Sequence, residues 1–279
     1  MHFQFVVNGV RVRAHVYSVR WRMNKSQLNW RKWGTVAVGL LLIVLLVWHR
    51  GARALAQSSV SASDDTQLLN GFRRVEVASI SDALEQLFGR RRYMSHRMQP
   101  IFPAKFAGFA LTVRLQKDEG NNDPAALNGM LAAIDQGAAN SVWVMVVEDG
   151  ADIAGMGGLM GTAMWSRGYA GAVIDGGVRD VGHLRKIGFP VYALGIVPST
   201  SVHHYRFSAA NTPLVCDGVE VKAGDIVAAD GDGVVVVPRG QAAEVLAKAQ
   251  QLDFQEHSMY GYIEKYKSIV EAVKQFGRL

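Results

Sequence analysis

The sequence predicts a layered α/β domain. Predicted strands and helices alternate between residues 106 and 194, and short strands separated by Asp-Gly turns gather between residues 215 and 237. The chain has 279 residues, of which 49% are hydrophobic and 19% are charged, and this composition is typical of globular proteins. The single cysteine, Cys216, excludes an internal disulfide framework and any metal site built from several thiolates.

The segment Ser79-Ile80-Ser81-Asp82 opens a short helix, with a serine as its N-cap and Gly89 at its end. A β-rich segment at 106–115 precedes a turn-rich loop at 118–124. Further strands are predicted at 141–147, 171–174 and 190–194, helices at 125–136, 159–167, 181–187 and 241–276, and short strands within 215–237.

The positive charge of the chain is confined to its N-terminal part. Residues 1–56 contain nine basic and no acidic side chains, which leaves 21 basic and 24 acidic residues in 57–279. The formal net charge of +6 therefore gives no reason to expect that the main domain binds nucleic acid.

Residues 1–56 are predicted to be a signal peptide or leader. Residues 34–48 carry no charge, and 15 residues are fewer than the roughly 20 that a transmembrane helix needs. Basic residues precede this run, and Ala54-Leu55-Ala56 follows it as a small-residue cleavage site before Gln57. Met23 as the true start would give a leader of ordinary length. The alternative is an uncleaved anchor in the inner membrane through residues 34–48.

Either form of the leader places the rest of the chain outside the cytoplasm, in the periplasm or secreted. We therefore divide the sequence into a leader (1–56), a polar spacer (57–72) and one domain (73–279). No contact with a membrane is expected beyond the leader.

Residues 144–180 carry the most informative chemistry. They are predicted to form a strand, a glycine-rich loop, a helix, a second strand and a charged loop that ends at Arg179 and Asp180. When a helix joins two parallel strands, the carboxyl ends of both strands lie at one edge of the sheet, where such sheets bind ligands. The loops at 155–158 and 175–180 are therefore expected to meet.

These two loops have complementary chemistry. Glycines before a helix expose backbone N–H groups to an anion, and the helix dipole favours negative charge there. Arg179 offers a guanidinium to a carboxylate, and Asp180 offers an oxygen ligand to Mg²⁺ or Mn²⁺. Together these groups suit an α-keto acid. The alternatives are a surface ion pair between Arg179 and Asp180, and glycines that only allow close packing.

A dinucleotide-binding or S-adenosylmethionine-binding site is a competing interpretation. Gly155, Gly157 and Gly161 follow a strand, and Asp175 lies 20 residues after Gly155. The fingerprint requires a tight turn after the strand, whereas here seven residues separate Val147 from Gly155. This spacing disfavours nucleotide binding.

The same residues carry a resemblance to a known family. Gly157-Gly158-Leu159-Met160, followed by the run AGAVIDGGVRD that ends at Asp180, resembles the signature of RraA-like proteins. This family contains 4-hydroxy-4-methyl-2-oxoglutarate aldolases and the regulator of ribonuclease E activity A. Supporting matches extend over roughly residues 73–264, including Ser81-Asp82-Ala83-Leu84 and Gly224-Asp225-Ile226-Val227.

The resemblance implies a fold, an activity and roles for residues. The fold is an α/β/β swivelling domain that forms homotrimers or homohexamers. The activity is metal-dependent cleavage of a 4-hydroxy-2-oxo acid to pyruvate, often accompanied by oxaloacetate decarboxylation. By position, the backbone of Gly157, Gly158, Leu159 and Met160 would hold the substrate carboxylate. Arg179 would bind substrate and stabilise the enolate, and Asp180 would hold Mg²⁺ or Mn²⁺.

This chain departs from the family pattern in two respects. Several aldolases carry an acidic residue where this chain has Gly158. The family also draws a glutamate from the C-terminal region of a neighbouring subunit, for which Glu256 is a candidate. The non-catalytic branch, which binds ribonuclease E, lacks the metal-site aspartate. A silent binding protein on the same fold is therefore the second hypothesis.

Overall fold

The computed structural model describes residues 2–7, 10–15 and 64–277. The chain divides after residue 60 into two units. In the first unit, β1 (His2–Val7) and β2 (Val10–His15) form an antiparallel hairpin. The predicted apolar run at 34–48 and the predicted cleavage site before Gln57 lie outside the described residues. Within the described ranges, no helix has the length and apolar character needed to cross a membrane.

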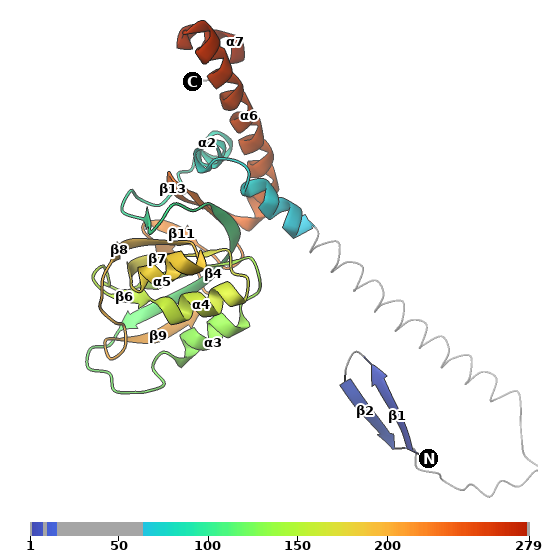
Figure 1. Cartoon of the computed structure of the whole chain (residues 1–279), viewed down its shortest axis with the longest axis vertical. Helices are drawn as coiled ribbons and strands as arrows, with labels where there is room; N and C mark the ends of the chain where they lie inside the picture. The colour runs from blue at the N-terminus through green and yellow to red at the C-terminus, as the bar shows by residue number, and fades with distance from the viewer. Residues whose placement is uncertain (1, 8–9, 16–63, 278–279) are drawn as a thin grey trace, which may run out of the picture. The chain divides into compact units, whose positions relative to one another are not determined.

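The second unit is built on a mixed sheet of nine strands (Figure 1). The strand order is β13-β12-β4-β5-β7-β8-β3, with β6 paired to β7 and β9 paired to β4. Parallel pairing joins β4, β5, β7 and β8, and also β6 with β7, while the other pairs are antiparallel. The strands are β3 (Gln99–Pro100), β4 (Phe106–Lys117), β5 (Ser141–Val147), β6 (Ala154–Met156), β7 (Gly171–Val178), β8 (Val191–Ile196), β9 (Tyr205–Ala210), β12 (Ile226–Asp230) and β13 (Gly233–Val237).

The two faces of this sheet have different covers. Helices α3 (Asn128–Gln136), α4 (Gly158–Ser166) and α5 (Val181–Ile187) pack on one face. A hairpin of β10 (Leu214–Cys216) and β11 (Val219–Val221) packs on the other. Side chains alternate accordingly along β5, because successive residues of a strand point to opposite faces. The mixed α/β class predicted from the sequence is confirmed.

A third apolar cluster lies at the β12–β13 end of the sheet. Here α2 (Val77–Phe88) and α6 (Ala242–Tyr266) pack over both strands. Residues 64–72 are helical, and their Leu69 and Phe72 are buried in the same cluster. Residues 57–72 were predicted to be a polar spacer, whereas these two side chains join residues 64–72 to the core.

The predicted C-terminal helix is present but divided. After the 3₁₀ turn η1 (Arg239–Gln241), α6 extends away from the sheet (Figure 1). It ends at Lys267, which adopts the left-handed conformation with φ 56°. The Ser268 side chain then accepts a hydrogen bond from the Glu271 N–H and caps α7 (Ile269–Phe276).

Other boundaries also differ from the sequence prediction. Helix α2 begins at Val77, so Ser79 lies buried inside it, and α3 begins at Asn128, three residues later than predicted. Strand β7 continues to Val178, although residues 175–180 read as a loop. Partners on both sides keep this glycine-rich segment extended, because Gly177 pairs with Ala154 of β6 and with Gly195 of β8.

Replacing Gly161 with alanine is expected to destabilise the fold. A Cβ there would lie 2.2 Å from Leu184 Cδ2 and 3.2 Å from Met156 Cε, so the fully buried Leu184 side chain would have to repack or the helices would have to shift. Overpacking of this kind costs about 1–3 kcal/mol, more than the roughly 1 kcal/mol that alanine gains in helix propensity. Urea unfolding measures the loss. Gly182→Ala in α5 is the matched control, since its Cβ would meet no atom within 4 Å. Equal effects of the two substitutions would contradict the packing account.

Candidate active site

Two adjacent chain segments form the candidate site. Strand β6 leads through Gly157 into α4, and β7 leads through Arg179 and Asp180 into α5. The two strands run parallel and side by side, and the Arg179 N–H donates to Met156 O at 3.0 Å. Both helices therefore begin at the same edge of the sheet, as the sequence predicted.

Asp180 joins the two segments. Its carboxylate Oδ2 accepts a hydrogen bond of 2.8 Å from the Gly158 N–H and lies 3.8 Å from Arg179 Nε. The backbone of Asp180 is left-handed, with φ 59° and ψ 33°, and asparagine and aspartate tolerate this conformation better than other non-glycine residues. The left-handed turn between β7 and α5 therefore favours an aspartate at position 180, which is also the residue type predicted to bind the cation.

The N-terminus of α4 presents backbone donors. Gly161 makes the first intrahelical hydrogen bond, to Gly157 O, so the three preceding N–H groups have no acceptor in the helix. The whole segment from Gly157 to Met160 was predicted to bind an anion, but the Gly158 N–H donates to Asp180 Oδ2. The N–H groups of Leu159 and Met160 remain for a ligand.

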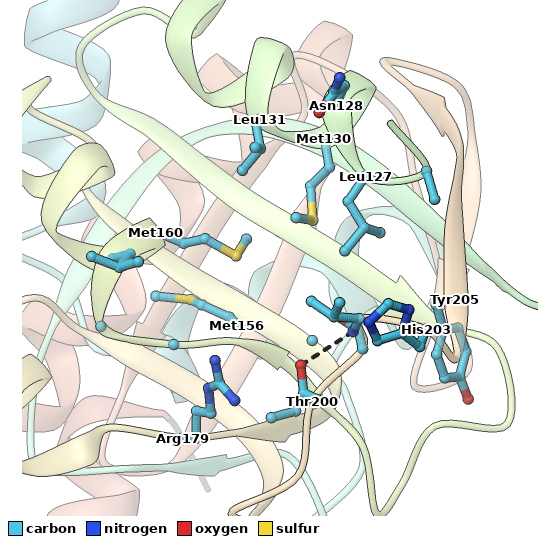
Figure 2. Close-up of a pocket in the computed structure, with 18 of the residues that line it drawn as sticks. Leu127, Asn128, Met130, Leu131, Met156, Met160, Arg179, Thr200, His203 and Tyr205 are labelled. Atoms are coloured by element: carbon cyan, nitrogen blue, oxygen red, sulfur yellow. Dashed lines mark hydrogen bonds between the residues drawn. The ribbon is translucent and has the colours of Figure 1, made fainter. Parts of the chain in front are cut away.

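The Arg179 side chain lies beside these donors. Its Nη1 donates to Ser199 O at 3.2 Å, and the side chain is 44% exposed. Figure 2 shows the guanidinium within the pocket, on the wall formed by the β7 edge. This guanidinium is partly anchored and still open to an anionic ligand.

A cavity of about 380 Å³ lies between these groups and α3. Its lining includes all six residues predicted from the sequence, namely Gly157, Gly158, Leu159, Met160, Arg179 and Asp180. Such a volume lies within the range of small-molecule sites. The structure therefore brings the predicted residues together, while their chemical roles stay predictions.

Two segments of the cavity wall were not predicted from the sequence. One runs from Asp123 to the middle of α3, and the other covers residues 200–205. His203 lies in a turn with φ 68° and lines the cavity. The turn-rich run at 118–124 was the only sequence signal for either segment. The two segments are far apart in sequence, and the antiparallel pairing of β9 with β4 brings them together.

Tyr205 also lines the cavity, but its hydroxyl is engaged elsewhere. Burial raises the pKa of Tyr205, and its hydroxyl donates to Glu148 O at 2.8 Å. The phenol therefore stays neutral and supports the turn at residues 200–204.

A short hydrogen-bond chain supports the loop from the α5 side. The Thr162 hydroxyl donates to Gly158 O at 2.8 Å, and its oxygen lies 2.8 Å from His183 Nε2. Because the hydroxyl proton is used on Gly158, His183 Nε2 must be the donor in the second bond. A side chain at position 158 would crowd Asp180 and His183, because a Cβ there would lie 3.2 Å from Asp180 Cβ and 3.4 Å from His183 Cδ2.

Replacing Gly157 with alanine is expected to impair ligand binding more than stability. A Cβ at this position would lie 2.8 Å from Asp180 Oδ2 and 3.1 Å from Arg179 Nε, so both functional groups would shift. Misplacement of about 1 Å can lower activity by about 10²-fold. The checks are the Kd for pyruvate by calorimetry and the midpoint of urea unfolding. Unchanged pyruvate affinity would contradict the proposed placement of the anion.

The acidic groups near the site suit a largely hydrated cation. Among residues 64–277 and the two N-terminal strands, no three His, Cys, Asp or Glu side chains gather as a metal cluster. Asp180 is 51% exposed and uses Oδ2 for Gly158, so Oδ1 is available. Mg²⁺ binds through as few as one or two carboxylates and keeps several waters. The donor set therefore fits Mg²⁺ held by one aspartate.

Two other sequence candidates lie outside this cavity. Asp175, the acid of the imitated dinucleotide fingerprint, accepts a 2.7 Å hydrogen bond from the Asp217 N–H and lines a different cavity. Glu256 lies on α6, where the Tyr260 hydroxyl donates to it at 2.7 Å, and it does not line the cavity of this chain. The role of Glu256 across a subunit boundary stays a prediction.

The fold and site place the chain in a defined family. Residues 77–236 match the RraA-like family model, described as Aldolase/RraA, and this span is more than half of the chain. The protein belongs to the RraA-like family, as its sequence signature predicted.

Some similar proteins are named as aldolases, and others are named as members of the RraA family of ribonuclease inhibitors. A Halalkalibacterium halodurans protein provisionally named 4-hydroxy-4-methyl-2-oxoglutarate aldolase is 27% identical over 67% of this chain and 84% of its own length. A 4-hydroxy-4-methyl-2-oxoglutarate aldolase of Thermus thermophilus is 32% identical over 48% of this chain and 77% of its own length. The crystal structure of Streptomyces coelicolor RraAS2, an unusual member of the RNase ES inhibitor RraA protein family, superposes with a TM-score of 0.61 at 26% identity, over 72% of this chain and 97% of RraAS2.

Proposed function

We propose that this protein is a lyase that cleaves a 4-hydroxy-2-oxo acid to pyruvate with the help of a divalent cation. The observation that carries the proposal is the grouping of the Arg179 guanidinium, the free N–H groups of α4 and the Asp180 carboxylate on one wall of one cavity. The relatives named as aldolases support the same reaction class.

The chemistry follows from the placement of these groups. The N–H groups of Leu159 and Met160 bind the substrate carboxylate, and Arg179 binds beside them. In the cleavage, the C4 hydroxyl loses its proton to a base and the C3–C4 bond breaks. The bonding electrons form the enolate of pyruvate, which takes a proton at C3. Arg179 stabilises the negative charge on the enolate oxygen.

Asp180 would hold Mg²⁺ or Mn²⁺ through Oδ1. When bound, the cation would supply positive charge next to the carboxylate and keto oxygens of the substrate. Oxaloacetate decarboxylation leads to the same enolate, so we expect it as an accompanying activity.

Release of pyruvate tests this function directly. The purified protein is incubated with 4-hydroxy-4-methyl-2-oxoglutarate and with oxaloacetate, each with Mg²⁺, with Mn²⁺ and with excess EDTA. We expect both acids to release pyruvate faster than in protein-free blanks at the same cation concentration, and EDTA should abolish this excess. No metal-dependent release from either acid would favour the alternative of a non-catalytic RraA-like binding protein. Gly158, which lacks the acidic side chain of several aldolases, is the observation that favours this alternative.

We also propose that the protein acts outside the cytoplasm as a homotrimer or homohexamer. The basic residues before the uncharged run at 34–48 support export to the periplasm or beyond, or anchoring in the inner membrane. Family membership supports the oligomer. N-terminal sequencing of the mature protein should begin at Gln57, and light scattering should give the mass of three or six chains. A cytoplasmic protein that retains its N-terminus would contradict the leader.

A further inference from the structure

We propose that the site prefers a 4-hydroxy-2-oxo acid whose C4 carries an apolar alkyl or aryl group in place of a second carboxylate. The inference rests on the proposed function for the keto-acid end of the substrate. For the other end it rests on the side chains that line the rest of the cavity.

The wall opposite Arg179 is apolar. Figure 2 shows Leu127, Met130 and Leu131 gathered across the pocket from the guanidinium. Met130 is 3% exposed, so it forms a fixed inner surface, whereas Leu131 at 48% lies at the rim. A ligand tail that covers these side chains gains affinity through the apolar surface that it removes from water.

The charges of the lining disfavour a second carboxylate. Arg179 is the only lysine or arginine among the described residues that line the cavity, and it faces Asp180. The other carboxylate of the lining is Asp123, whose Oδ1 accepts a 2.8 Å hydrogen bond from the Ala125 N–H. Within this chain, the far end of a dicarboxylic substrate would therefore find no second cation. The remaining polar side chains of the described lining include the neutral Asn128, Thr200 and Ser201.

A methionine gives the cavity a further property. Met160 is partly buried, unbranched and flexible, and its thioether adapts to differently shaped apolar groups. We therefore expect the enzyme to tolerate variation in the size of the tail more than the addition of charge to it.

A binding experiment tests the preference for an apolar substrate tail without requiring turnover. Calorimetry compares 2-oxohexanoate with 2-oxoadipate in the presence of Mg²⁺. These acids have the same chain length and differ in a terminal methyl group against a terminal carboxylate. We expect the Kd of 2-oxohexanoate to be lower by about tenfold or more, because the terminal carboxylate of 2-oxoadipate must lose hydration without gaining a second cationic partner from the described lining. Equal or tighter binding of 2-oxoadipate would overturn the proposal.

A charge-insertion variant tests the same preference in turnover. The measured quantity is the ratio of kcat/KM for 4-hydroxy-2-oxohexanoate to that for 4-hydroxy-4-methyl-2-oxoglutarate. Leu131→Lys adds a cation at the exposed rim and should lower this ratio about tenfold, whereas Leu131→Gln, which is polar but uncharged, should lower it less.

The outcomes separate the two proposals. A wild-type preference for the dicarboxylic acid would overturn the apolar tail and leave the lyase function standing. Tighter binding of 2-oxohexanoate without pyruvate release from any acid would overturn the lyase function and support the ligand preference.

Discussion

Replacing Arg179 with methionine is expected to lower kcat/KM for pyruvate release by about 10²-fold or more. The guanidinium is the one strong positive charge of the described cavity lining, and loss of a group that stabilises developing negative charge costs about 10²–10³-fold. The fold should survive, because the side chain is 44% exposed and makes a single hydrogen bond, to Ser199 O. Steady-state kinetics and thermal unfolding measure the two effects.

Two further variants sharpen this prediction. Arg179→Lys keeps the charge and loses the planar fork, so it should recover only part of the activity. Arg185→Met is the matched control, since Arg185 is exposed on the neighbouring helix and donates to Ile101 O at 3.3 Å. If both methionine variants retain full activity, Arg179 has no part in the reaction.

Replacing Asp180 with asparagine is expected to abolish most metal-dependent turnover with little change in stability. Asparagine tolerates the left-handed backbone at φ 59°, and its amide oxygen can still accept the hydrogen bond from the Gly158 N–H. Only the negative charge is lost. We expect a fall in rate of about 10²-fold and a marked rise in the Mg²⁺ concentration needed for half-maximal activity.

The Asp180→Ala variant separates the backbone contribution from the chemical one. Alanine has no acceptor for Gly158 and adopts the left-handed conformation at a cost of about 1–2 kcal/mol. Its unfolding free energy should therefore fall below that of Asp180→Asn, although both lose activity. Normal turnover in Asp180→Asn at low Mg²⁺ would refute the assignment of this carboxylate to the cation.

The sequence predicted the parts of the fold that depend on local pattern. The apolar run of β5 and the alternation from β5 to α5 follow from residues close in sequence, and the structure confirms their class and order. The meeting of Gly157 with Arg179 follows from the parallel connection between strands, and the structure shows it directly.

The features that were missed depend on partners distant in sequence. Strand β6 has only three residues and is extended because β7 lies beside it. The turn that carries His203 reaches the cavity through the pairing of β9 with β4. The helix at 64–72 is defined by burial of Leu69 and Phe72 against the β12–β13 end of the sheet. No local periodicity encodes these contacts.

The hydrogen bond between Asp180 and Gly158 was also beyond sequence reasoning. The glycine loop predicted free amides, and nothing in the sequence indicated that the neighbouring carboxylate uses one of them. This bond fixes one oxygen of Asp180, and it reduces the anion site of α4 to the N–H groups of Leu159 and Met160.

A crystal structure with oxalate and Mg²⁺ tests the central claim most directly, because oxalate mimics the enolate of pyruvate and does not react. We predict one oxalate carboxylate on the N–H groups of Leu159 and Met160 and on the Arg179 guanidinium, with Mg²⁺ on the free oxygen of Asp180. Oxalate bound away from the start of α4, with Arg179 turned out of the cavity, would contradict this account.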